Sequence, residues 1–174
     1  MLILLIGIIL FAVMIAEAML AARHDVALRA AGAVEPRDDV YPVMQIVYPG
    51  SFLAMLLEGY WRGAGADAIF AIGAAVFVAA KALKYWAIAT LGARWTFRVL
   101  VPQGSALILR GPYRWFPHPN YIGVMGELLG LAIAMHSIIA GPLAVVGFAL
   151  ILMKRIGVEE QALGRRPSTP GVRH

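Results

Sequence analysis

Hydrophobic positions in this chain gather into five apolar runs, and shorter polar stretches separate them. The runs occupy residues 1–22, 41–60, 68–91, 121–135 and 143–153. Each of the first three provides about 20 residues, the length that an α-helix needs to cross a bilayer core. We predict three transmembrane helices within residues 1–91 and two further helices after them.

The last two runs are shorter, and a turn containing Gly141 and Pro142 separates them. About 15 helical residues extend roughly 22 Å, whereas the bilayer core is about 30 Å thick. We therefore expect a short helical hairpin whose cytosolic ends lie below the membrane surface. This would leave a depression lined by polar residues. Residues 92–118 are too broken to span, and we assign them to a cytosolic segment between helices three and four.

The composition agrees with this pattern. The chain has 174 residues, of which 61% are hydrophobic and 14% charged, and its mean hydropathy is +0.77. These values lie outside the range of soluble domains. The predicted fold class is an all-α integral membrane protein with about five transmembrane helices. Because the chain has no cysteine, disulfides, thiolate metal sites and Cys nucleophiles are excluded.

The distribution of positive charge predicts an orientation. If five helices alternate in direction, fourteen of the 15 Lys and Arg residues fall on one side and only Arg62 on the other. The positive-inside rule then places the N-terminus outside and the active site on the cytoplasmic face. The cations lie between apolar runs, so the expected contact is with membrane lipid and not with nucleic acid. The sequence does not indicate an oligomeric state.

The start of the fourth helix reads Arg110-Gly-Pro-Tyr-Arg-Trp-Phe-Pro-His-Pro-Asn-Tyr-Ile-Gly123, with a first-turn proline after His118. The free amides of this helix N-terminus point into the expected depression. One arc of about 120° on this helix holds its small and polar residues, which are Asn120, Gly123, Gly126, Glu127 and Gly130. Another helix or a ligand can approach closely there.

Several charged residues in or near the helices have two interpretations. Glu127 is an acid inside a membrane helix, which favours a function, although an ion pair with a neighbouring cation is the alternative. We expect Lys81 and Lys84 to extend toward the membrane surface. Arg155 and Glu159 could form a solvated pair at a helix end. No metal site is predicted, because His118 and His136 lie roughly 27 Å apart along one helix.

Three motifs occur in a recognisable order. They are Leu91-Gly-Ala-Arg-Trp-Thr96, Gly111-Pro-Tyr-Arg-(three residues)-His-Pro-Asn-Tyr-Ile-Gly123 and, after the hairpin, Arg155-Ile-(two residues)-Glu-Glu-(two residues)-Leu163. This arrangement, over roughly residues 82–163, resembles the isoprenylcysteine carboxyl methyltransferase family. The segment from Lys84 to Thr96 looks most like the small bacterial branch found beside type III polyketide synthases, whose members methylate alkylpyrone-type lipids.

The resemblance implies an S-adenosylmethionine-dependent O-methyltransferase without a Rossmann domain. Its cofactor enters from the cytosol, and its lipophilic acceptor, a polyketide-type lipid or a prenylcysteine-like carboxylate, arrives from the bilayer. Residues 92–163 then form the cofactor site. The residues that the resemblance and the local chemistry assign to cofactor binding are His118, Asn120, Tyr121, Glu159, Glu160 and Arg114. Arg155 is the candidate for orienting an anionic acceptor, and His118 or Glu127 is the candidate base for an acceptor that must lose a proton.

Two features depart from the family pattern. Pro117 occupies the place where the family usually has Arg, and residues 164–174 lack the usual charged, aromatic helix and are expected to be disordered. These departures keep a non-catalytic, degenerate relative as an alternative. A membrane reductase of the sterol type that uses NADPH is another, although its phosphates would require a denser group of cations than this chain offers.

Overall fold

A computed structural model describes residues 1–36, 40–100 and 108–162. Its five α-helices are α1 (Leu2–Ala30), α2 (Tyr41–Trp61), α3 (Ala68–Leu91), α4 (Pro119–Ala134) and α5 (Ala140–Ala162). Two 3₁₀ helices, η1 (Gly92–Arg94) and η2 (Gly111–Arg114), lie between α3 and α4. The regular elements of the described residues are helical, as predicted.

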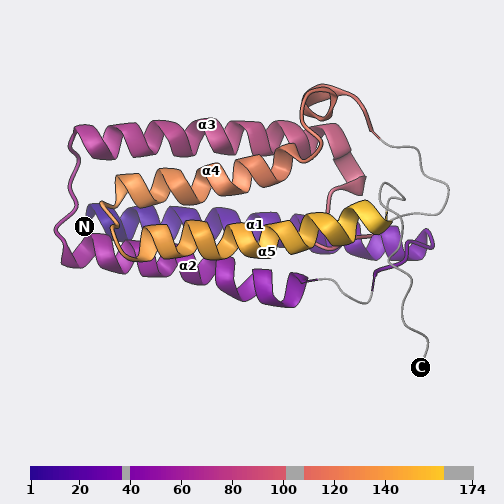
Figure 1. Cartoon of the computed structure of the whole chain (residues 1–174), viewed down its shortest axis with the longest axis horizontal. Helices are drawn as coiled ribbons and strands as arrows, with labels where there is room; N and C mark the ends of the chain where they lie inside the picture. The colour runs from indigo at the N-terminus through magenta and orange to yellow at the C-terminus, as the bar shows by residue number, and fades with distance from the viewer. Residues whose placement is uncertain (37–39, 101–107, 163–174) are drawn as a thin grey trace.

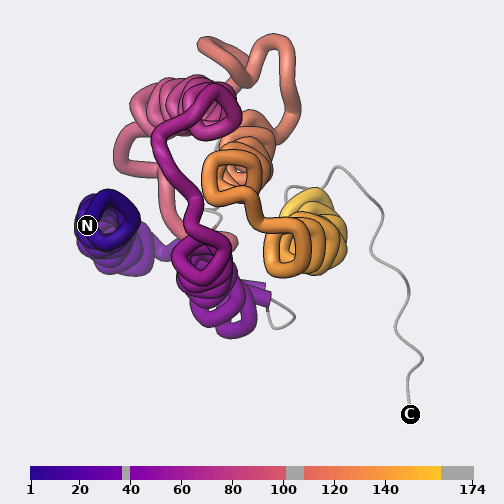
Figure 2. The backbone as a smooth tube through the Cα atoms, turned by 90° about the vertical axis from the view of Figure 1, so that its left-hand side faces the viewer, coloured from indigo at the N-terminus to yellow at the C-terminus, as the bar shows by residue number. Residues whose placement is uncertain are grey.

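The five helices run side by side in alternating directions (Figure 1). One end of the bundle holds the N-terminus and the α2–α3 and α4–α5 turns, and the other end holds η1, η2 and the end of α5. Viewed along the bundle, α4 lies in the centre among α2, α3 and α5, while α1 stands at the side (Figure 2). This arrangement makes α4 the helix on which α2, α3 and α5 pack, whereas α1 packs on α2 and η1.

Three helical segments are long and apolar enough to cross a membrane, namely Leu2–Ala30, Ala68–Arg94 and Ala140–Gln161. Their outer faces expose many large apolar side chains, as expected of surfaces that contact lipid. Helix α4 has 16 residues and is about 24 Å long, so it is short as predicted.

The fifth helix corrects our expectation of two short terminal helices. It has 23 residues and is about 34 Å long. Residues 154–162 continue the helix beyond the apolar run, because they contain no proline and are mostly good helix formers. Glu159 and Glu160 therefore belong to the last turns of α5.

Glycines allow α3 and α4 to touch along their backbones. A Cβ atom added to Gly130 would lie 2.5 Å from the Phe77 amide nitrogen, and one added to Gly73 would lie 2.2 Å from the Ala134 amide nitrogen. A Cβ on Gly123 would lie 2.8 Å from the Cβ of Lys84. The glycine face predicted on α4 is thus a helix–helix contact, the close packing that small residues permit in membranes.

Two acids fix the end of the bundle opposite η1 and η2. Glu58 accepts hydrogen bonds from the hydroxyl of Ser137 at 2.5 Å and from the Ala140 amide at 2.7 Å, at the start of α5. Asp67 caps α3 by accepting a 2.8 Å hydrogen bond from the Phe70 amide, which lowers the pKa of Asp67. His136, which lies 3.2 Å from Asp67, packs at the same end.

Candidate functional site

A cavity of about 530 Å³ lies between the helices near the end that holds η1 and η2. Small-molecule sites commonly have volumes of about 300–1,000 Å³. Its walls come from α1, α2, α3, the segment 94–100, the start of α4 and α5 from Phe148 onward. We call the polar part of its lining, formed by His118, Asn120, Tyr121, Arg155 and Glu159, the mouth. The remaining apolar body includes Phe11, Met14, Ile15, Met44, Val124 and Phe148.

The polar mouth joins the start of α4 to the end of α5. The hydroxyl of Tyr121 donates a 2.5 Å hydrogen bond to Glu159 Oε2 and accepts one of 3.3 Å from Arg155 Nε. The His118 ring stacks on Tyr121 with 5.5 Å between ring centroids. His118 Nδ1 lies 3.7 Å from Glu159 Oε2, and His118 Nε2 lies 3.5 Å from Glu160 Oε1. The structure therefore brings together five residues that lie up to 42 positions apart in the sequence.

The mouth also contains polar atoms that can still receive a ligand. Asn120 Oδ1 is buried and has no hydrogen-bond partner among the described residues, and His118 Nε2 is buried and makes no hydrogen bond there beyond its 3.5 Å approach to Glu160 Oε1. Such atoms are normally satisfied in folded proteins. Tyr113 lines the same region, and its burial together with the charge of Glu159 raises the pKa of its hydroxyl. These groups suit a ligand with hydrogen-bond donors and positive charge.

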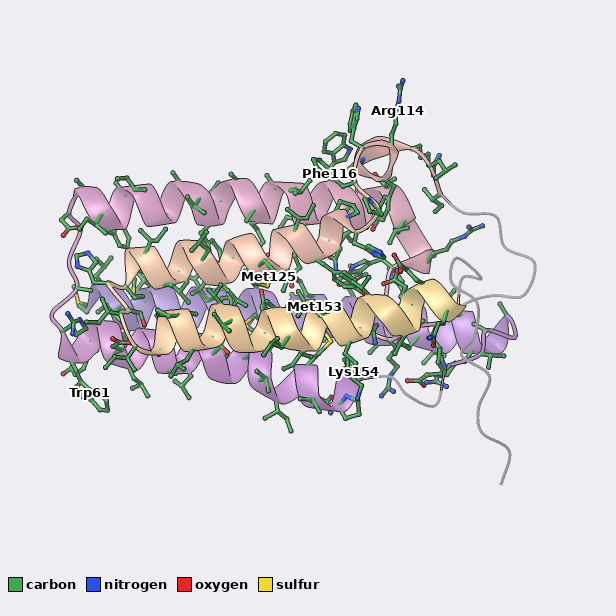
Figure 3. All side chains as sticks on the ribbon, viewed as in Figure 1. Trp61, Arg114, Phe116, Met125, Met153 and Lys154 are labelled. Carbon is green, nitrogen blue, oxygen red and sulfur yellow. The ribbon has the colours of Figure 1, made fainter. Side chains whose placement is uncertain are left out.

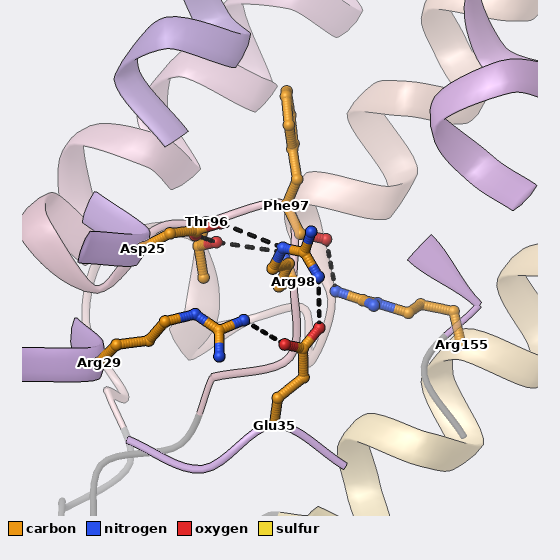
Figure 4. Close-up of polar contacts among 7 residues, drawn as sticks. All are labelled: Asp25, Arg29, Glu35, Thr96, Phe97, Arg98 and Arg155. Carbon is orange, nitrogen blue, oxygen red and sulfur yellow. Dashed lines mark hydrogen bonds and ion pairs between the residues drawn. The ribbon is translucent and has the colours of Figure 1, made fainter. Parts of the chain in front are cut away.

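Arg155 is buried and connects the mouth to the segment before η2. Its Nη2 donates a 2.6 Å hydrogen bond to the carbonyl of Phe97. The neighbouring Arg98 lies 2.7 Å from Glu35 Oε1 and 3.4 Å from Asp25 Oδ2 (Figure 4). The buried Arg155 is thus held by the wall of the cavity, and is not the solvated partner that its spacing from Glu159 could indicate.

The polar contacts around Glu35 fasten this wall to α1. Burial raises the pKa of Glu35, but hydrogen bonds from Arg98 and Arg29 outweigh that effect, so the net pKa lies below its ordinary value. The same hydrogen bond from Arg98 raises the pKa of that guanidinium. His24 Nδ1 lies 2.7 Å from the carbonyl of Trp95 and adds a further contact between α1 and this segment.

The structure does not place Arg114 in the cavity wall. It lies on η2, is exposed, and points away from the bundle (Figure 3). The reason is the seating of η2, whose Trp115 packs on Trp86 of α3 with 5.7 Å between ring centroids. This position does not support our expectation that Arg114 binds the cofactor, which stays a prediction. Pro117, the residue found in place of the family arginine, does line the cavity.

Glu127 lies behind the cavity wall in a buried group of charges. Lys81 Nζ lies 3.1 Å from Glu127 Oε2, Lys84 Nζ lies 3.4 Å from Glu127 Oε1, and the hydroxyl of Tyr48 donates to Glu127. The same two lysines pair with Glu17 of α1, at 3.1 Å and 2.6 Å. Our expectation that Lys81 and Lys84 extend to the membrane surface is wrong, because buried carboxylates hold both of them inside the bundle.

Sequence reasoning did not find the role of Glu17. Glu17 is the one charged residue in the first apolar run, but its partners lie 64 and 67 positions away on another helix. The sequence signal for this role is a single acidic residue in a membrane helix, because such a residue normally pairs with another group inside the bundle.

These features define a class of protein, an α-helical membrane protein whose helices enclose a largely apolar cavity with a charged, aromatic mouth. Residues 72–165 match the sequence model of the isoprenylcysteine carboxyl methyltransferase (ICMT) family. The chain belongs to this family of membrane methyltransferases.

Two curated relatives extend over most of the chain. One is the "Uncharacterized protein YpbQ" of Bacillus subtilis (strain 168), 30% identical over 148 residues, which are 85% of this chain and 88% of that protein. The other is an "Uncharacterized protein" of Haemophilus influenzae, 25% identical over 142 residues, which are 81% of this chain and 83% of that protein. No solved structure shows a significant match to this chain.

Proposed function

We propose that this protein is an S-adenosylmethionine-dependent O-methyltransferase that acts on a lipophilic acceptor inside the membrane. The observation that carries the proposal is the cavity itself, because one space joins a mouth with carboxylates and aromatic rings to an apolar body between membrane helices. A charged, soluble methyl donor suits the first part, and a lipid suits the second.

The residues of the mouth fit the donor. Glu159 and Glu160 provide negative charge for its ammonium and sulfonium groups, and the rings of His118 and Tyr121 provide faces for a cation. The N-terminus of α4 provides positive dipole for its carboxylate, and Asn120 Oδ1 is a buried acceptor awaiting a donor. When bound, the cofactor supplies an activated methyl group on a sulfonium.

The protein's contribution to such a reaction is mainly alignment in a dry site. The hydrogen bonds among Tyr121, Glu159 and Arg155 fix the mouth, and the carbonyl of Phe97 holds Arg155 in place. The acceptor is a polyketide-type lipid, as in the alkylpyrone branch, or a prenylcysteine-like carboxylate that Arg155 would orient. We propose an outside N-terminus and a cytoplasmic mouth.

Binding experiments with the detergent-solubilised protein test this proposal. Titration with S-adenosylmethionine, S-adenosylhomocysteine and NADPH should show binding of the first two only. Glu160→Ala and Tyr121→Ala should abolish that binding. Binding of NADPH alone would favour the reductase, and the absence of all binding would favour a degenerate relative without catalysis, to which Pro117 points. Incubating membrane lipid extract with methyl-labelled donor then identifies the lipid that is labelled.

A further inference from the structure

Two opposite charges lie on the cavity wall outside the polar mouth. Glu17 of α1 and Lys84 of α3 both line the cavity, and Lys84 Nζ lies 2.6 Å from Glu17 Oε2. Their residues are only 6% and 2% exposed. Charges inside a membrane bundle are costly and often mark a functional site. Glu17 also lies outside the residues that match the family, so the family assignment does not explain it.

The charged groups around this pair balance one another. Behind it, Lys81 lies 3.1 Å from both Glu17 and Glu127, and Lys84 lies 3.4 Å from Glu127. From α2, the hydroxyl of Tyr48 donates to Glu127, and on α3 the ring of Tyr85 lies 5.5 Å from Lys81 Nζ. Two carboxylates face two ammonium groups, so the ionised group has a net charge of zero.

The pair is next to the polar mouth along α4. Gly123 packs on Lys84, and Gly123 is three residues, or about 4.5 Å along the helix axis, beyond Asn120. On the other side, Phe11, Met14 and Ile15 of α1 provide apolar wall beside Glu17. A molecule with an apolar tail and one polar oxygen could therefore place the oxygen at Lys84 and the tail along α1.

We propose that Glu17 and Lys84 bind the reacting oxygen of the acceptor, and that this acceptor is a neutral lipid with an acidic hydroxyl, an enol or a phenol. The inference rests on the proposed function. The carboxylate of Glu17 takes the proton from the acceptor hydroxyl, and the ammonium of Lys84 stabilises the oxyanion. The oxyanion forms the new O–CH₃ bond as the S–CH₃ bond breaks, and the bonding electron pair leaves on sulfur. Glu17 then releases its proton to water.

Charge balance selects the hydroxyl over a carboxylate. A neutral hydroxyl that passes its proton to Glu17 leaves the whole group at zero charge. An ionised carboxylate would add one uncompensated negative charge to a buried site, which is strongly unfavourable. Glu127 cannot take the same role, because Glu17, and not Glu127, lines the cavity in the described part of the chain.

A coloured probe tests this subsite without the methyl donor. We would bind 4-heptyl-2-nitrophenol to the purified full chain in detergent and follow its phenolate absorbance against pH. A nearby cation lowers the pKa of an acid by about 1–3 units. The ionisation midpoint of the bound probe should therefore lie at least about one pH unit below its value in empty micelles.

Matched variants separate the subsite from the fold. Lys84→Met should return the midpoint to the micelle value. Lys81→Met removes an ammonium from the same group but not from the cavity wall, and should keep most of the shift. Glu17→Gln should keep the low midpoint yet reduce turnover of hydroxyl acceptors by about 10²-fold or more. Thermal melting of each variant identifies any that fail to fold.

The outcomes distinguish the two proposals. An unshifted midpoint in the folded wild type, or equal losses in the Lys84 and Lys81 variants, overturns the subsite. Displacement of the probe by decanoate as effectively as by 4-heptylphenol overturns the preference for a hydroxyl. Binding of S-adenosylmethionine is measured separately in the same samples. If the probe shows no shift but the donor binds, the subsite is overturned and the proposed function is not. If the donor does not bind, the proposed function fails, and the probe titration still reports whether Lys84 lowers the pKa of a bound hydroxyl.

Discussion

At the scale of single residues, the site depends on groups that hold one another in place. Tyr121 is the centre of this arrangement, because its hydroxyl contacts both Glu159 and Arg155 while its ring stacks on His118. Hydrogen bonds to charged partners contribute about 1.5–3 kcal/mol each, so the loss of one hydroxyl is measurable.

Removing that hydroxyl provides the first prediction. Tyr121→Phe keeps the ring but releases Glu159, and we expect S-adenosylmethionine to bind about tenfold more weakly in calorimetric titration. Arg114→Ala should leave the affinity unchanged, because Arg114 points away from the bundle. A loss of affinity in the Arg114 variant as large as that in the Tyr121 variant would contradict our placement of the site.

At the scale of elements, backbone contact between α3 and α4 positions both the mouth and the buried charges. Asn120 and Glu127 are on the α4 face that carries Gly123 and Gly130, and that face packs on α3. The glycines therefore serve the site indirectly, by bringing Lys84 close to the start of α4.

The second prediction concerns this contact. In Gly130→Ala, the added Cβ would lie 2.5 Å from the Phe77 amide nitrogen, and backbone cannot move aside cheaply. We expect the variant to lose more than about 2 kcal/mol of stability and to melt at a lower temperature in detergent. Gly147→Ala on α5 is the matched control, because no atom lies within 4 Å of its added Cβ. Equal melting of both variants would refute the close packing.

At the scale of the whole molecule, α1 is attached in two ways: apolar side chains of its first half, from Ile3 to Met14, pack against the hydrophobic core, and polar contacts attach its second half. Its most buried residues include Glu17, and its end is tied to segment 95–98 through Asp25 and His24. Since α1 forms one wall of the cavity, these contacts decide whether the cavity is closed on that side.

The third prediction follows from Glu35, whose pKa in the folded protein lies below its ordinary value of 4.5. Such a group stabilises the fold above its unfolded pKa, and this contribution is lost as the pH falls through its folded pKa. When the pH is lowered from 6 to below 4.5, the melting temperature of the wild type should therefore fall by more than that of Glu35→Gln. Parallel curves for the two proteins would exclude the contribution of this carboxylate.

The fourth prediction tests the topology by cysteine labelling. Because the chain has no cysteine of its own, only an introduced one can react. We expect Arg114→Cys to react with a membrane-impermeant maleimide only from the cytoplasmic side of vesicles, and Arg62→Cys only from the other side. The two residues lie at opposite ends of the bundle, so labelling of both from the same side would contradict the alternating arrangement.

The sequence by itself determined the class of fold, the membrane environment, the family and the polar residues that begin α4. These features depend on apolar runs, local spacing and motif order, and each can be recognised within a short stretch of chain. The motifs also contain all five residues of the mouth, including Tyr121 and Glu159.

Only the tertiary structure decided which charges meet. Glu17 pairs with lysines more than 60 positions away, Arg114 points outward because η2 is seated on Trp86, and α5 extends through the paired acids. No local pattern contains this information, because an ion pair between helices depends on how the helices rotate and pack against one another. Here the backbone contact between α3 and α4 fixes that rotation, and with it the wall of the cavity.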